Sequence, residues 1–150
     1  LSQLHQRPRS KASLSDEYET PVSLFNELCT KYQQCPQTDA AANEKNTKCG
    51  AFLTDIATLA DIDRGDIWCN PPHSMNGYCV KLCHDYWKKW NRNVMMILPT
   101  NTMSSIYWHE LIENKGHYHP IKGRIKFLVN GEQSKHQSRN AYCVVVWDKV

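Results

Sequence analysis

Hydrophobic residues recur at helical spacing in three segments of the chain, and each segment predicts an amphipathic helix with one face against a core. The first segment follows Thr20-Pro21, which indicates a helix with Thr20 as N-cap and Pro21 at the first helical position. The third helix is expected to start near Thr102. The apolar positions are Phe25, Leu28, Cys29 and Tyr32, then Cys79, Leu82, Cys83, Tyr86 and Trp90, and finally Ile106, Tyr107 and Leu111.

Short apolar runs between these helices predict strands. Residues 67–69 form a brief apolar run that stops at Asn70-Pro71-Pro72, because a proline has no N–H to donate to a sheet. Residues 94–98 are apolar without interruption, which is typical of a buried parallel strand. Shorter strand candidates lie at residues 37–42 and 51–54.

Two segments near the end of the sequence, residues 124–129 and 141–147, are also rich in residues that favour strands. A polar connection joins them, so they predict a terminal antiparallel hairpin with a long loop. The whole pattern predicts an α/β fold with an open, mostly parallel sheet that ends in this hairpin. Ligands of such sheets gather at the carboxyl ends of the strands.

Length and composition favour one globular domain. The chain has 150 residues, of which 41% are hydrophobic, and this is enough for a single core. Residues 1–15 are polar and basic and are expected to form a flexible arm, which leaves residues 16–150 as the domain. Only about 20 residues separate His73 from Val94, so we expect no separate target-recognition domain.

Cysteine usage and hydropathy predict the compartment. The seven cysteines are odd in number and scattered, which favours a reducing environment over a disulfide framework. No apolar run approaches the roughly 20 residues of a membrane-spanning helix. We therefore expect a cytoplasmic protein without membrane contact. We also expect no metal, because no complete zinc-ligand spacing is present and His117 and His119, in a predicted loop, lack an evident third ligand.

The net charge of +3 is too small to indicate nucleic-acid binding, but its distribution is more informative. One basic cluster lies in the N-terminal arm, and a second lies near the C-terminus with Glu132 as its one acid. Both are candidates for phosphate contacts, and the alternative is a solvated surface with a frayed tail. The clusters consist of Arg7, Arg9 and Lys11, and of Lys122, Arg124, Lys126, Lys135, His136 and Arg139.

The tetrapeptide Asn70-Pro71-Pro72-His73 suits methyl transfer to a planar amine. The side-chain oxygen of Asn70 and the carbonyl of Pro71 can each accept a hydrogen bond from an NH₂ group and so direct its lone pair. The prolines fix φ and hold both acceptors still, and positioning is a large part of what an enzyme contributes to a displacement. The ring of His73 can stack on a flipped or single-stranded base. The alternative is a strand that ends at two prolines and a turn.

The order of several motifs resembles that of the phage-type DNA N6-adenine methyltransferases, the Dam-like family, over most of residues 16–147. The catalytic tetrapeptide is similar to the family's Asp/Asn-Pro-Pro-Tyr/Phe loop, with His73 where Tyr or Phe is usual. The other matching motifs are Tyr18-Glu19-Thr20-Pro21, Asp39-Ala40-Ala41 with Asn43 and Lys48-Cys49, Leu98-Pro99-Thr100 with Trp108-His109, and Gly123-Arg124-Ile125-Lys126-Phe127.

This resemblance implies a Rossmann-like class I methyltransferase fold, S-adenosyl-L-methionine as cofactor, and direct transfer to the N6 amine of adenine in DNA, double- or single-stranded. By the same resemblance Tyr18, Thr20 and Pro21 line the methionine side of the cofactor, with Asp39 and Ala40 at the end of the first strand beside it. Asp55 follows the second predicted strand, where an acid can accept hydrogen bonds from the ribose hydroxyls; the alternative is an ordinary loop acid.

DNA contact is expected from Arg124, Lys126, Lys135, His136 and Arg139, whose composition suits binding to phosphates. Two other functions compete with DNA methylation. A protein glutamine-amide methyltransferase presents a similar NH₂ group to a similar loop. A noncatalytic relative that binds nucleic acid is suggested by His73 and by the absence of a glycine-rich cofactor turn.

Overall fold

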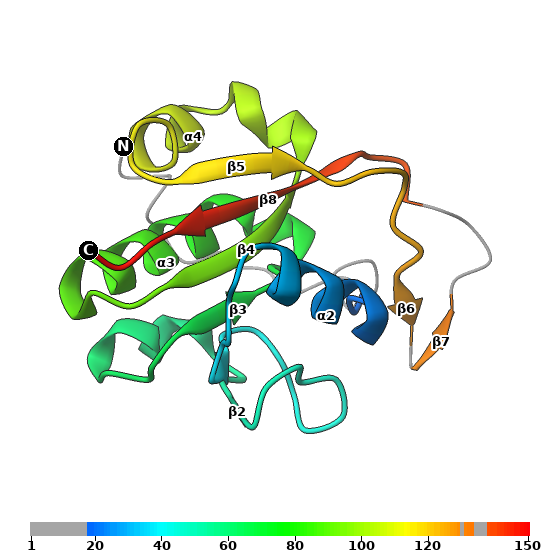
Figure 1. Cartoon of the computed structure of the whole chain (residues 1–150), viewed down its shortest axis with the longest axis horizontal. Helices are drawn as coiled ribbons and strands as arrows, with labels where there is room; N and C mark the ends of the chain where they lie inside the picture. The colour runs from blue at the N-terminus through cyan, green and yellow to red at the C-terminus, as the bar shows by residue number, and fades with distance from the viewer. Residues whose placement is uncertain (1–17, 130, 134–137) are drawn as a thin grey trace.

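The computed structural model describes residues 18–129, 131–133 and 138–150 (Figure 1). The predicted arm at residues 1–15, with Lys135 and His136, lies outside these ranges. The helices are α2 (Val22–Lys31), α3 (Asn76–Trp90) and α4 (Ile106–Leu111), with 3-10 turns η2 (Ile56–Asp61), η3 (His73–Met75) and η4 (Thr100–Ser104). The strands are β1 (Thr38–Asp39), β2 (Ala51–Phe52), β3 (Ile67–Cys69), β4 (Val94–Pro99), β5 (His117–Pro120), β6 (Leu128–Val129), β7 (Glu132–Gln133) and β8 (Tyr142–Trp147).

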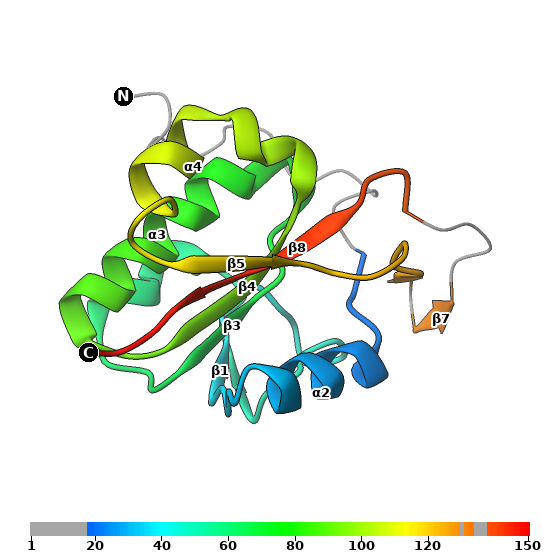
Figure 2. The ribbon, with the colours of Figure 1, turned by 45° about the horizontal axis from the view of Figure 1, so that its top comes forward.

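One six-stranded sheet forms the centre of the molecule, in the order β2-β1-β3-β4-β8-β5. Strands β2, β1, β3 and β4 are parallel neighbours, and β8 runs antiparallel to both β4 and β5. This arrangement confirms the predicted α/β fold with a mostly parallel sheet and an antiparallel end. Helix α2 covers one face of the sheet, while α3 and α4 cover the other (Figure 2).

The alternation of side chains along β4 and β8 builds a core on each face, because successive strand residues point to opposite sides of a sheet. Met96 and Leu98 pack with the residues of α3 and α4, whereas Met95 and Ile97 pack with those of α2. All six residues of β4 are buried. The continuous apolar run that predicted a buried parallel strand therefore belongs to a strand covered by helices on both faces.

The predicted terminal hairpin has different strands from those expected. Strand β8 pairs with β4 and β5, and not with residues 124–129. Within that segment only Leu128–Val129 forms a strand, β6, which pairs with β7 in a separate small hairpin. Ile125 and Phe127 are buried in the core on the α2 face. His117 and His119 belong to the edge strand β5, so the predicted loop at these histidines is also wrong.

Two helix starts differ from the predictions as well. Helix α2 begins at Val22 with Pro21 as its N-cap residue, and no side chain caps it. Thr20 has a different role, which is described below. Helix α4 begins at Ile106 after the 3-10 turn η4, and Ile106 is 62% exposed while Trp108 is buried. The predicted apolar face was therefore wrong at Ile106.

Among the described residues, no helix is both long and apolar enough to cross a bilayer. No cluster of three or more His, Cys, Asp or Glu side chains with the geometry of a metal site occurs in the same part of the chain.

Candidate active site

A pocket opens at the carboxyl ends of β1 and β3, where an open α/β sheet is expected to bind its ligand. It contains about 380 Å³ of empty space, part of which is open solvent. Its walls come from three separate segments: the residues before α2, the loop after β1, and the loop after β3. The lining residues are Tyr18, Glu19, Thr20, Asp39, Ala41, Asn46, Lys48, Trp68, Asn70 and Pro72.

Asn70 directly follows β3, and its amide nitrogen makes two hydrogen bonds. Nδ2 donates to Thr20 Oγ1 at 3.0 Å and to the Tyr18 carbonyl at 3.2 Å. Thr20 is almost fully buried. Its hydroxyl accepts the hydrogen bond from Asn70 and does not cap α2, so the predicted N-cap role of Thr20 is wrong. A primary amide has two N–H donors and one oxygen acceptor. With both donors used, the side chain of Asn70 presents its oxygen, Oδ1, as the acceptor for a ligand.

The two prolines after Asn70 continue into a tight turn. Pro72 has φ −55° and ψ 137°, and its carbonyl accepts a hydrogen bond from the Met75 N–H at 2.8 Å. This bond begins η3, which leads directly into α3. The loop is thus anchored at β3 on one side and at α3 on the other, and it needs no glycine to make the turn.

His73 sits within a group of aromatic rings beside the pocket. Its Nε2 is hydrogen-bonded to the hydroxyl of Tyr142, and burial raises the pKa of that hydroxyl to about 12, so Tyr142 stays protonated at neutral pH. Tyr18 and Phe127 stack with ring centroids 6.0 Å apart, and His73 meets both rings edge-on. Paired backbone hydrogen bonds of 2.9 Å between Glu19 and Leu128 hold the two segments together.

Asp39 is the last residue of β1 and is only 3% exposed. Its Oδ2 accepts from the Lys48 N–H at 2.9 Å and its Oδ1 from the Ala41 N–H at 3.3 Å. Burial raises the pKa of this carboxyl to about 6, while these two hydrogen bonds and the Lys48 charge oppose the rise. A carboxyl at the end of a strand with a strongly raised pKa, facing a pocket, is the kind of group found at functional sites.

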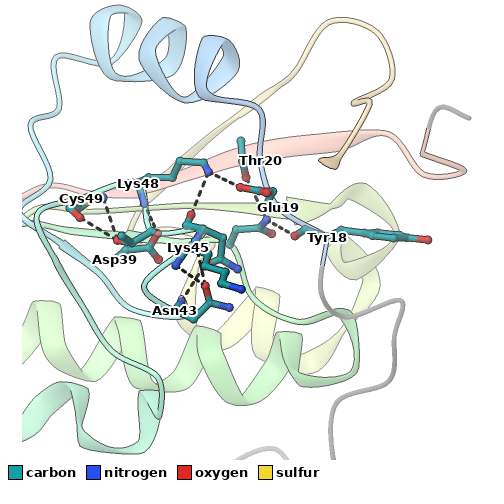
Figure 3. A network of polar contacts seen from close by, with 11 residues as sticks. Tyr18, Glu19, Thr20, Asp39, Asn43, Lys45, Lys48 and Cys49 are labelled. Atoms are coloured by element: carbon teal, nitrogen blue, oxygen red, sulfur yellow. Dashed lines mark hydrogen bonds and ion pairs between the residues drawn. The ribbon is translucent and has the colours of Figure 1, made fainter. Parts of the chain in front are cut away.

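The pocket lining also contains an ion pair, between Glu19 and Lys48, that the sequence did not predict. Lys48 Nζ lies 3.0 Å from Glu19 Oε2, and Nζ also donates to the Asn46 carbonyl at 3.1 Å (Figure 3). Both residues lie inside motifs noted in the sequence, yet nothing in the local pattern links them because 29 positions separate them. The pair places opposite charges next to Asp39 in the same pocket.

A family model described as DNA N-6-adenine-methyltransferase (Dam) matches residues 7–149, nearly the whole chain. The chain belongs to this family. No curated protein sequence matches it. Family membership makes the chain an enzyme of the DNA N6-adenine methyltransferase class, and the observed sheet is consistent with a Rossmann-like methyltransferase fold.

The structure brings together most of the cofactor residues that the Dam-like motifs predicted. Tyr18, Thr20 and Asp39 line the pocket beside Asn70. Ala40 is fully buried next to Asp39. Pro21 caps α2 and is not among the lining residues.

Asp55 and the basic residues lie elsewhere on this Dam-family domain. Asp55 Oδ1 accepts from the Ala57 N–H at 3.0 Å and caps η2, and Asp55 does not line the pocket. Arg124, Lys126 and Arg139 are exposed, and Arg124 Nη1 donates to the Arg139 carbonyl at 2.7 Å. Two residues of the predicted basic surface near the C-terminus, Arg124 and Arg139, are therefore in direct contact.

Proposed function

We propose that the protein transfers the methyl group of S-adenosyl-L-methionine to the N6 amine of adenine in DNA, and that Asn70 orients this amine. The observation that carries the proposal is the pair of hydrogen bonds from Asn70 Nδ2 to Thr20 and to the Tyr18 carbonyl. They consume the donors of the amide and leave Oδ1 to accept from the substrate. The reaction is a direct displacement without a covalent enzyme intermediate.

The pocket suits S-adenosylmethionine in position and in charge. It adjoins Asn70, lies at the carboxyl ends of parallel strands, and contains two carboxylates and one ammonium for a ligand with charges of both signs. Tyr18, Thr20 and Asp39 would hold the methionine side, with Ala40 behind Asp39 and Pro21 fixing the direction of the chain into α2. Asp55, which follows β2 and lies outside the pocket lining, would serve the ribose. When bound, the cofactor supplies a methyl group activated by an adjacent sulfonium.

Asn70 Oδ1 and the Pro71 carbonyl would each accept one hydrogen of the adenine amine. Two fixed acceptors hold the nitrogen lone pair in the direction of attack, which removes orientational freedom before the reaction. The nitrogen gains positive charge as its new bond forms, so both hydrogen bonds strengthen in the transition state. The ring closure of Pro71 and Pro72 restricts φ and keeps this geometry rigid.

The aromatic residues beside Asn70 would receive the base. A base must leave the duplex stack to reach an enclosed active site, and stacking on aromatic rings offsets part of that cost. His73 is hydrogen-bonded to Tyr142, and the ring of Tyr18, a residue that is 38% exposed, lies beside that of His73. Arg124, Lys126 and Arg139, with Lys135 and His136, would contact phosphates and position the DNA without reading its sequence.

Transfer of labelled methyl from S-adenosylmethionine, followed by nucleoside analysis, tests the proposal. Unmethylated double-stranded DNA, single-stranded DNA, RNA and a protein extract serve as parallel acceptors. Label in N6-methyladenine is the expected result. Label on protein glutamine would support the glutamine-amide alternative, and binding of DNA without any transfer would support the noncatalytic one.

Asn70→Ala provides the test of mechanism. We expect single-turnover transfer to fall by about 10²- to 10³-fold, the loss typical when one preorganised hydrogen-bonding group is removed. Binding of S-adenosylhomocysteine should persist because Asn70 acts on the amine. Asn26→Ala, at an exposed position of α2, is the matched control and should keep full activity. Wild-type turnover in Asn70→Ala would exclude the assigned role.

A further inference from the structure

The ion pair between Glu19 and Lys48 has no role in the proposed transfer, yet it is one of the most enclosed charged contacts in the pocket. The side chain of Lys48 is 6% exposed and that of Glu19 is 15% exposed. Glu19 lies in the segment before α2, whose backbone pairs with Leu128, and Lys48 lies in the loop after β1. The two charges therefore join two separate segments that line the pocket, as the dashed line between them in Figure 3 shows.

Fold stability alone does not account for this pair. Removing two charges from water is costly, and buried ion pairs replaced by apolar residues of similar volume are often neutral or even more stable. Segments 18–20 and 127–128 are already tied by backbone hydrogen bonds, and the loop after β1 is already tied to Asp39. A pair of charges that lines a pocket at the carboxyl ends of parallel strands is better explained by recognition of a charged ligand.

The contacts of Lys48 show how its ammonium is presented. Its backbone N–H is fixed on Asp39, and Nζ has acceptors on Glu19 and on the Asn46 carbonyl within the described part of the chain. An ammonium group has three N–H donors, so one remains for a ligand oxygen. Lys48 is also the one cationic side chain among the lining residues, all of which the structure describes. A ligand carboxylate in this pocket has no other side-chain cation to bind.

We propose that Glu19 and Lys48 together recognise the zwitterionic amino-acid end of the methyl donor, with Lys48 binding its α-carboxylate and Glu19 its α-ammonium. The inference rests on the proposed function and assigns two residues to the pocket that the family motifs left without a role. The two side chains compensate each other's charge in the free protein, and the ligand adds one ion pair with Lys48 and one with Glu19. The charge balance fits, since the pocket holds one more carboxylate than ammonium and S-adenosylmethionine carries one net positive charge.

Calorimetric titration of the whole chain with two unreactive ligands tests this assignment. S-adenosylhomocysteine has the amino-acid end, and 5′-methylthioadenosine has the same nucleoside and thioether without it. Lys48→Met should weaken binding of S-adenosylhomocysteine about 10- to 100-fold, the range for loss of a charged hydrogen bond, and leave binding of 5′-methylthioadenosine unchanged. Lys45→Met is the matched control, because Lys45 is exposed in the same loop and does not line the pocket.

Glu19→Gln gives the complementary test at the other charge. This variant should bind S-adenosylhomocysteine more weakly than wild type does. Its affinity for an analogue that keeps the α-carboxylate and lacks the α-amine should be unchanged. A first answer comes from the wild-type chain alone, because it should bind S-adenosylhomocysteine much more tightly than 5′-methylthioadenosine. Far-UV circular dichroism and thermal unfolding show whether each variant is folded.

Four outcomes would overturn the assignment. Lys48→Met with unchanged affinity for S-adenosylhomocysteine, or with equal losses for both ligands, shows that Lys48 does not contact the amino-acid end. Equal wild-type affinity for the two ligands shows that the pocket does not recognise that end at all. A wild-type chain that binds neither ligand refutes the proposed function itself, whereas the other three results leave that function intact.

Discussion

The buried carboxyl of Asp39 should make stability depend on pH in a direction opposite to that of most acidic residues. Burial raises its pKa from 3.8 to about 6, so the folded state binds a proton more tightly than the unfolded state. The stabilisation from this proton is complete below about pH 4 and is lost as the pH rises through about 6. A difference of about two pKa units corresponds to about 3 kcal/mol.

Asp39→Asn isolates this contribution because asparagine does not titrate. The stability of the variant relative to wild type should rise by about 3 kcal/mol between pH 4 and pH 7.5 and then stay level. The absolute difference at pH 7.5 will be smaller, because the asparagine side chain has one oxygen for two backbone donors, and an unpaired buried donor costs about 1–3 kcal/mol. The change with pH is therefore the quantity to compare.

Urea unfolding followed by tryptophan fluorescence measures this quantity, and the chain has five tryptophans. Wild type and Asp39→Asn are compared at each pH, so that every other titrating group contributes equally to both. A stability difference that stays constant from pH 4 to pH 7.5, or that falls, would refute the assigned pKa shift and its cause. The variant should also lose affinity for S-adenosylhomocysteine. This loss would show that the Asp39 carboxylate, which lowers the stability of the fold when it is ionised, contributes to ligand binding.

Two further substitutions test the fold and the DNA surface. Gly116→Ala should lower the free energy of unfolding by about 1–3 kcal/mol, because an added Cβ would lie 2.7 Å from the Val146 carbonyl oxygen. Gly50→Ala, where nothing lies within 4 Å, is its control, and equal thermal unfolding of the two variants would contradict the packing argument. Arg124→Ala and Arg139→Ala should each reduce the slope of log affinity for DNA against log salt by about 1 without changing S-adenosylhomocysteine binding. An unchanged slope would exclude the phosphate contact.

Strong hydrophobic periodicity predicted the elements that surround the site. Residues 94–98 and the helical repeat from Cys79 to Trp90 were assigned correctly, because both are packed against the core in the way that their patterns require. The prediction of a strand that stops before Asn70 was also correct, because the two prolines that follow cannot continue a sheet. The sequence therefore located the proposed catalytic loop at the carboxyl end of a buried strand.

The edge strand β5 was missed because its environment leaves no pattern. His117–Pro120 is largely exposed and ends in proline, so it has neither alternation nor an apolar run. Residues 124–129 had the better strand composition, but β8 already has neighbours on both sides in β4 and β5. Ile125 and Phe127 use their apolar side chains to cover the α2 face instead. Composition alone does not report which strand edge is available.

Contacts between distant segments account for the rest of what was missed. Thr20 satisfies the local rule for an N-cap, but its hydroxyl is used by Asn70, 50 positions away. The Glu19–Lys48 pair is similar, since each residue alone resembles an ordinary surface charge. Local rules describe a residue and its near neighbours, and the candidate active site is assembled from three segments that meet only when the sheet forms.

The position of β8 also has a consequence for how newly made chains reach this structure. Residues 142–147 follow the other strands of the main sheet in sequence, yet they lie between β4 and β5 and are the sole sheet partner of β5 among the described residues. During synthesis the backbone edge of β4 stays unpaired until these residues have left the ribosome. An open, apolar strand edge is prone to pair with another chain, so nascent copies are vulnerable to aggregation until the last strand of the main sheet arrives.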